Sequence, residues 1–117
     1  TRCSRDWSSD VCSSDLAIAR LPGDSRVALV ASGGLSHFAI DEDFDRQVLE
    51  ALARRDEGAL LAIEESWFNG NTCETKNWLA LAAAMDAANA AMTLVDYVPC
   101  YRTAAGTGQG MAFAYWE

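Results

Sequence analysis

The sequence RVALVASGGLSHF, residues 26–38, decides how the chain is interpreted. Its apolar run, residues 27–31, predicts a buried parallel strand, because continuous apolar runs bounded by turn residues are typical of strands covered on both faces. Gly33 and Gly34 end this run, and His37, the only histidine among 117 residues, follows them. Open α/β sheets place their sites at the carboxyl ends of strands. The stretch therefore predicts that His37 is presented at a site.

The composition is that of one acidic globular domain. Half of the residues are apolar and the formal net charge is −8, which argues against the basic face that nucleic-acid binding requires. No apolar run approaches the roughly 20 residues of a membrane helix, and no apolar region follows a basic start as in a signal peptide. The spacing of the four cysteines matches no metal or redox motif. We therefore expect a cytoplasmic protein with no nucleic-acid or membrane partner.

Residues 1–16 differ from the rest of the chain. They show neither helical nor strand periodicity and are dominated by Ser, Asp and Cys, which predicts a disordered tail. Residues 6–16, DWSSDVCSSDL, also look like a translated sequencing-library adapter. On that interpretation the segment is non-native, the natural N-terminal part of the gene is missing, and residues 17–117 are the part to interpret. In that part Cys73 and Cys100 are expected to be packing residues.

Three helices are predicted downstream of the opening stretch. Acids at residues 41–43 favour a helix start, and apolar residues then recur at helical spacing. A short helix is predicted at residues 59–65, and a longer one at residues 73–89 with Thr72 as its N-cap. The apolar stripe expected to face the core from the first of these helices consists of Phe44, Val48, Leu49 and Leu52.

Two further strands complete the predicted organisation. Residues 92–98 read as a strand ended by Pro99, and residues 111–116 read as the last strand. The glycines of residues 105–110 lie before a strand rather than a helix, so they do not fit a phosphate-binding loop. We expect a mobile loop or hairpin lining a pocket. The order of elements indicates one α/β domain or part of one.

Two residues carry candidate chemistry. His37 suits a general acid or base near neutral pH, or a metal ligand; the alternative is a histidine satisfied by local hydrogen bonds. Glu74 lies in the first turn of a predicted helix, where a carboxylate complements the helix dipole or, held rigidly, ligates a metal. Ser36 forms no catalytic pair with His37, because sequence neighbours do not normally face each other and the G-x-S-x-G turn is absent.

Three blocks of sequence carry a family resemblance. They are residues 31–38 (ASGGLSHF), residues 69–78 (NGNTCETKNW), and residues 101–108 (YRTAAGTG) with residues 111–113 (MAF). Together and in this order they resemble the class III extradiol ring-cleavage dioxygenases, the superfamily of the protocatechuate 4,5-dioxygenase catalytic subunit and of gallate dioxygenases. The resemblance spans residues 17–117. It implies the C-terminal part of a three-layer α/β/α domain with a mixed sheet.

The resemblance also implies an activity and a site. Members of the family cleave a catecholic ring beside its hydroxyls with O2, at a non-haem Fe(II) held by two histidines and one glutamate. By motif, Glu74 is the implied iron ligand and His37 the implied acid–base residue, while Ser36, Thr107 and Gly108 are implied in substrate binding. The implied substrate is a carboxylated catechol. A homodimer or a small helical partner subunit is expected at the family level.

The chain departs from the family in its histidines. Both iron-binding histidines of the family lie in its N-terminal part, and this chain has only His37. We therefore expect the chain as written to bind Fe(II) poorly and not to turn over. Two alternatives stay open. One is a metal-free binding or scaffold member of the same fold, and the other is a metal-free acid–base enzyme that uses His37 and a carboxylate.

Overall fold

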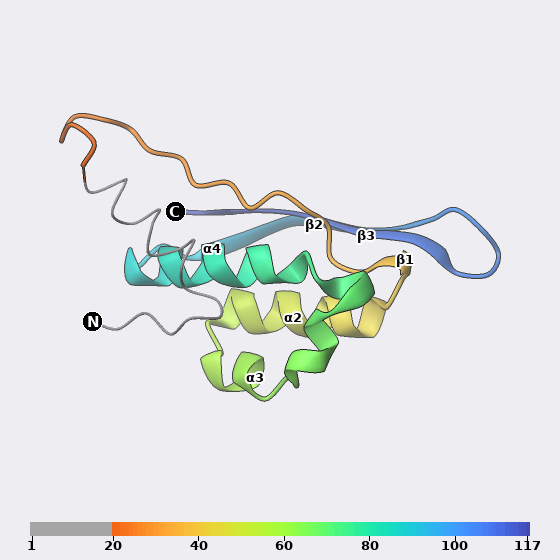
Figure 1. Cartoon of the computed structure of the whole chain (residues 1–117). Coiled ribbons are helices and arrows are strands. Elements are labelled where there is room, and N and C mark those ends of the chain that lie inside the picture. Colours follow the sequence, from red (N-terminus) through yellow and green to blue (C-terminus); the bar gives the residue numbers. More distant parts are fainter. Residues whose placement is uncertain (1–19) are drawn as a thin grey trace. The chain divides into compact units, whose positions relative to one another are not determined.

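The computed structural model describes residues 20–117 and divides into two units, Thr1–Val30 and Ala31–Glu117 (Figure 1). The tail and adapter predictions for residues 1–16 lie outside the described residues. In the described part of the first unit, the N–H of Ser25 donates to the carbonyl of Pro22 at 2.9 Å. This hydrogen bond closes a turn that contains Pro22 and Gly23.

The strand predicted at residues 27–31 is wrong. These residues form neither a helix nor a strand, and Val30 is 83 % exposed. An apolar run becomes a strand only when a neighbour completes its hydrogen bonds, and all described strands pair with one another instead. The first described strand starts later, at His37 itself.

The second unit combines helices with a three-stranded sheet of order β1-β3-β2. Both strand pairs are antiparallel. The resemblance implied a mixed sheet, and the parallel strand predicted at residues 27–31 does not form. The unit is thus a small α/β arrangement, as expected at that level. Its elements are β1 (His37–Ala39), α2 (Glu42–Arg54), α3 (Glu57–Leu61), η1 (Glu65–Phe68), η2 (Gly70–Thr72), α4 (Thr75–Ala87), β2 (Met92–Tyr101) and β3 (Thr107–Trp116).

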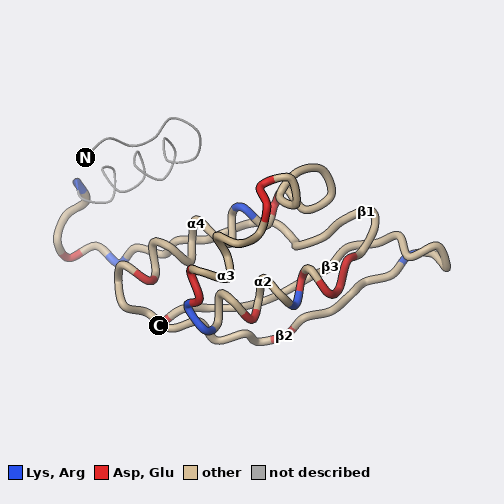
Figure 2. The backbone as a smooth tube through the Cα atoms, turned by 90° about the horizontal axis from the view of Figure 1, so that it is seen from below, with Lys and Arg blue, Asp and Glu red and all other residues tan. Residues whose placement is uncertain are grey.

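Helix α2 follows its sequence signals closely. The side chain of Asp41 caps it by accepting from the N–H of Phe44 at 3.0 Å. Its solvent-facing side carries acids and bases four residues apart, visible as red and blue segments in Figure 2. Its apolar stripe enters the core as predicted, with Phe44, Val48, Leu49 and Leu52 all buried.

Helix α4 starts later than predicted, and Thr72 is not its N-cap. The Thr72 hydroxyl donates to the carbonyls of Trp67 and Asn69, so it closes the preceding 3-10 turns instead. Two side chains of α4 hold the glycine segment that precedes β1. The Trp78 indole N–H donates to the carbonyl of Gly33 at 3.2 Å, and Asn77 donates to the carbonyl of Ser32 at 2.8 Å.

The glycine-rich residues 105–110 belong to a β2–β3 hairpin, one of the two forms predicted. The hairpin closes where the N–H of Arg102 donates to the carbonyl of Thr107 at 2.7 Å. Strand β2 does not end at Pro99 but continues to Tyr101. It is an edge strand of the described sheet, where a missing proline N–H need not break the ladder.

The helices α2 and α4 lie on the same side of the sheet in Figure 1. Successive side chains of a strand point to opposite faces. On β3, Ala112, Ala114 and Trp116 pack against the core, while the alternate residues Met111, Phe113 and Tyr115 are exposed. Among residues 20–117, no helix has the length and apolar character needed to cross a membrane.

Candidate functional site

The Gly33-Gly34 break lets a carboxylate approach the backbone. Gly33 has a φ of 136°, and a Cβ on it would lie 2.7 Å from Oε2 of Glu74, so a larger residue would be both strained and crowded. The N–H of Gly34 donates to the same oxygen at 2.9 Å. The glycines predicted to end a strand therefore hold Glu74 in place.

The structure brings together His37 and Glu74, the two candidates singled out from the sequence. Nε2 of His37 lies 3.8 Å from Oε2 of Glu74. Both side chains reach solvent, with 24 % of His37 and 43 % of Glu74 exposed. Within the described chain the buried Nδ1 of His37 has no hydrogen-bond partner. The pair therefore presents an imidazole with an adjacent carboxylate at an accessible surface.

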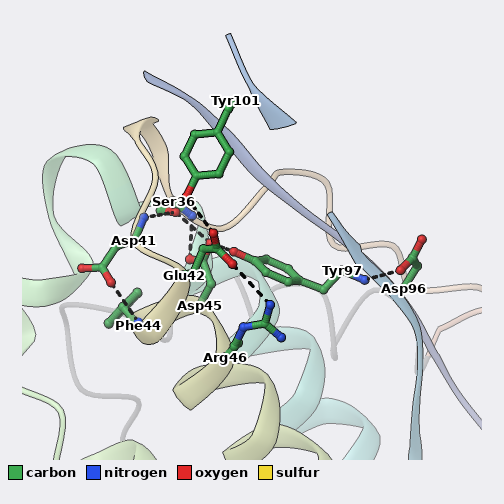
Figure 3. Close-up of polar contacts among 9 residues, drawn as sticks. All are labelled: Ser36, Asp41, Glu42, Phe44, Asp45, Arg46, Asp96, Tyr97 and Tyr101. Carbon is green, nitrogen blue, oxygen red and sulfur yellow. Dashed lines mark hydrogen bonds and ion pairs between the residues drawn. The ribbon is translucent and has the colours of Figure 1, made fainter. Parts of the chain in front are cut away.

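A buried polar network that was not predicted from the sequence lies next to this pair (Figure 3). The carboxylate of Asp45 accepts from the N–H of Ser36 at 2.9 Å and from its hydroxyl at 2.7 Å. The Tyr97 hydroxyl donates to the same carboxylate at 2.8 Å. Ser36 and Asp45 are both fully buried. Three elements, α2, β2 and the segment before β1, thus meet at one carboxylate.

Burial and hydrogen bonding set the ionisation of this network. Burial raises the pKa of Asp45 above its ordinary value, and the hydrogen bonds from Ser36 and Tyr97 oppose that rise. Burial also raises the pKa of Tyr97, and its donation to the Asp45 carboxylate raises it further. The Arg46 guanidinium lies 5.2 Å from the centre of the Tyr97 ring, within the range of a cation–π contact.

Strand β3 closes the network through a glycine. The N–H of Gly110 donates to the carbonyl of Ser36 at 2.7 Å, and the N–H of Leu35 donates to the carbonyl of Gly110 at 2.9 Å. A Cβ on Gly110 would overlap Oδ2 of Asp45. The backbone of β3 therefore comes this close to the buried carboxylate only because residue 110 is glycine.

Asp45 and Tyr97 were not predicted as parts of a site. Asp45 follows the acids of the predicted helix start, which looked like complements of the helix dipole. However, it precedes Val48 by three residues and Leu49 by four, so it lies on the apolar stripe. A carboxylate at a core position was the available signal. Tyr97 is separated from it by 52 residues, and no local pattern pairs the two.

The other predicted site residues lie around this region without a demonstrated role. The Ser36 hydroxyl also accepts from the N–H of Asp41 at 3.0 Å, so it is fully engaged within the protein. Thr107 and Gly108 lie at the start of β3, opposite Ala39 and Phe38 of β1. Substrate binding by Ser36, Thr107 and Gly108 stays a prediction.

The prediction that the two downstream cysteines are packing residues is wrong. Cys73 and Cys100 are both exposed free thiols. Cys73 lies in the turn between η2 and α4, and Cys100 lies on the edge strand β2. Neither side chain is buried in the core.

An open hollow of about 500 Å³ lies beside the start of α2. The Tyr101 hydroxyl donates to Glu42 at 2.7 Å there, which lowers the pKa of Glu42 and raises that of Tyr101. The hollow is polar and is not lined by His37 or Glu74. Its lining residues are Ala39, Ile40, Asp41, Glu42, Asp43, Arg46, Asn71 and Tyr101.

The described residues do not fit a complete iron site. A facial-triad site needs three protein ligands, and within residues 20–117 no group of three His, Cys, Asp or Glu side chains could hold a metal ion. Glu74 and His37 offer two donor side chains at most.

No protein-family model, curated protein or solved structure matches the chain.

Proposed function

We propose that the chain is the C-terminal part of the catalytic domain of a class III extradiol ring-cleavage dioxygenase, with His37 as its acid–base residue. The observation that carries this proposal is the 3.8 Å approach of His37 Nε2 to Glu74 Oε2. The two residues are implied by separate sequence blocks, and they share one accessible surface. The resemblance implies an acid–base histidine close to the metal but not bound to it, and an approach of His37 to the implied ligand Glu74 supports that role.

The proposed task of His37 is proton transfer. A neutral imidazole can take the proton of a phenolic hydroxyl and return it to the opened substrate ring. When the His37 imidazole takes up the proton, the carboxylate of Glu74 lies next to the positive charge on that imidazole. Glu74 Oε2 also accepts a hydrogen bond from the N–H of Gly34, which supports the position of this carboxylate.

The remaining parts of the proposal follow the resemblance. The substrates are O2 and a carboxylated catechol cleaved beside its hydroxyls. Glu74 is one of three iron ligands, and two histidines from outside this sequence would have to complete the set. The three-layer α/β/α fold, in which a further layer covers Met111, Phe113 and Tyr115, belongs to the same proposal. So do the cytoplasmic location and a homodimer or small helical partner subunit.

A metal-free acid–base enzyme is the second candidate. The same His37–Glu74 approach favours it, because a histidine beside a carboxylate can transfer protons without a metal. A metal-free binding or scaffold protein of the same fold is the remaining alternative, and it requires no turnover at all. The dioxygenase and the metal-free enzyme differ in whether an Fe(II) chelator stops their activity, and the scaffold protein has no activity to stop.

The test uses the uninterrupted protein encoded by the gene, assayed with carboxylated catechols for O2 consumption and for the absorbance of a ring-opened product. The proposed dioxygenase consumes O2 and stops after anaerobic treatment with an Fe(II) chelator. Activity that survives the chelator supports the metal-free enzyme instead. Absence of any turnover, together with absence of two further histidines upstream of residue 17, supports the scaffold.

A further inference from the structure

We infer that Asp45 is a positioning residue that holds His37 toward Glu74 by fixing the backbone and hydroxyl of Ser36. The inference rests on the proposed function for the use made of His37. It adds a residue that the sequence resemblance does not assign. The inference also assigns a role to the buried hydrogen-bond network beside His37 and Glu74.

Ser36 is held on every polar group it has. Its N–H and hydroxyl both donate to Asp45, its carbonyl accepts from the N–H of Gly110, and its hydroxyl accepts from the N–H of Asp41. The residue cannot rotate without breaking several buried hydrogen bonds, which are costly to leave unmade. His37 follows directly, so the direction of its Cα–Cβ bond is set by this anchor.

The other partner is held by the same short segment. The N–H of Gly34 donates to Glu74 at 2.9 Å, and the indole N–H of Trp78 on α4 donates to the carbonyl of Gly33. Residues 33–37 therefore connect the carboxylate on the α4 side with the imidazole on the β1 side. Asp45 anchors this segment to α2 through its hydrogen bonds with Ser36. Without Asp45, only the contacts with α4 and the pairing with β3 would orient residues 33–37.

The chemistry of Asp45 favours a positioning role over a purely stabilising one. Placing a carboxylate in a fully buried position costs desolvation energy unless hydrogen bonds compensate it. An apolar side chain could fill the space of Asp45 but could not accept from Ser36 and Tyr97. Only an acceptor with two oxygens satisfies the three donated hydrogen bonds found here.

The experiment uses the full 117-residue chain and needs neither substrate nor metal. Because the chain has one histidine, its imidazole signals in a long-range ¹H–¹⁵N spectrum need no further assignment. The readouts are the shift of the His37 ring signals and the nuclear Overhauser contact between that ring and the Glu74 side chain. Asp45→Asn keeps an acceptor for the Ser36 N–H but replaces the oxygen that binds the Ser36 hydroxyl.

We expect Asp45→Asn to shift the His37 ring signals and to lose the contact with Glu74. Ser36→Ala should give the same change, and the double variant should add nothing to it, because both substitutions break one connection. Tyr97→Phe should shift the signals in the same direction by less. If Asp45→Asn does not fold, the Ser36→Ala and Tyr97→Phe spectra carry the test.

Val48→Thr is the matched control, since Val48 is fully buried on the same helix but is not part of the network. It should lower stability and leave the His37 signals and the Glu74 contact in place. An unchanged contact in Asp45→Asn, or an equal loss in Val48→Thr, overturns the positioning role. Failure of the ring-cleavage assay leaves this result untouched, so the two claims fail separately.

Discussion

His37 and Glu74 meet at 3.8 Å because the same glycine segment holds both of them. Glu74 accepts from the N–H of Gly34, and His37 directly follows the anchored Ser36. Neither residue depends on a long flexible loop for its place. The site is thus built into the packing of α2, α4 and β3 around five consecutive residues, and its predictions can be tested by changing that packing.

The close approach at Gly110 makes a first prediction. Gly110→Ala should lower the free energy of unfolding by about 1–3 kcal/mol, because the new Cβ overlaps the Asp45 carboxylate. The matched control is Gly58→Ala in α3, where a Cβ would meet only an ordinary contact at 3.5 Å. That change should raise stability, by up to about 1 kcal/mol, through helix propensity. Urea unfolding monitored by circular dichroism measures both, and equal effects would contradict the account of Gly110.

The hydrogen bonds of Asp45 make a second prediction. Asp45→Ala should lower the free energy of unfolding by about 3 kcal/mol or more, since it leaves the buried Ser36 N–H and two hydroxyls without their acceptor. Asp45→Asn should cost less, because the amide oxygen still accepts from the Ser36 N–H. Urea titrations of the two variants give the order. A larger loss in Asp45→Asn than in Asp45→Ala would show that these bonds do not control stability.

The ionisation of Asp45 makes a third prediction, for the dependence of stability on pH. Burial raises its pKa in the folded protein, so the folded state binds the proton more tightly than the unfolded chain does. Its contribution to stability is then full below about pH 4 and is lost as the pH rises through the raised pKa. The unfolding free energy of the wild type minus that of Asp45→Asn should therefore fall with rising pH.

That difference is measured by urea unfolding at several pH values. The wild type minus Val48→Thr serves as the control, because neither residue titrates, and it should not change with pH. A difference for Asp45→Asn that grows with pH would mean that hydrogen bonding outweighs burial and lowers the pKa of Asp45.

Iron binding by the chain as written makes a fourth prediction. Two donor side chains at one surface should give only weak binding, because Fe(II) sites of this class use three protein ligands. Anaerobic isothermal titration of the 117-residue chain with Fe(II) should show no tight saturable binding. Sub-micromolar binding that disappears in Glu74→Ala would contradict this expectation and would mean that the chain supplies a complete site.

The sequence predicted those elements whose signals are local. The acidic start and the apolar stripe of α2 lie within a few turns of one another, and both were found; the Asp41 cap was not predicted. The strand at residues 27–31 was wrong because pairing partners, not apolar runs, decide where a strand forms. Thr72 was placed at a helix start, but its hydroxyl serves the preceding turns. The position of Thr72 in the sequence does not distinguish an N-cap of α4 from a hydroxyl that donates to the preceding turns.

The candidate site was predicted in part for the same reason. His37 and Glu74 stood out through residue type and the neighbouring glycines, although nothing local indicated that they approach one another. Asp45 and Tyr97 were missed because a buried carboxylate is recognised by what surrounds it. Ser36 lies only nine residues before Asp45, but Tyr97 on β2 and Gly110 on β3 are more than 50 residues further along the chain.

The most direct test of the central claim compares two variants in the uninterrupted protein. His37→Phe should lower the rate of ring cleavage by about 10²–10⁴-fold, the usual contribution of a general acid–base residue, while the iron content stays nearly unchanged. Glu74→Ala should lose the iron and the activity together. Glu57→Ala, which removes an exposed first-turn acid of α3, is the matched control and should change neither. Kinetic assays with metal analysis of the same preparations give both quantities, and loss of iron in His37→Phe would contradict the assigned roles.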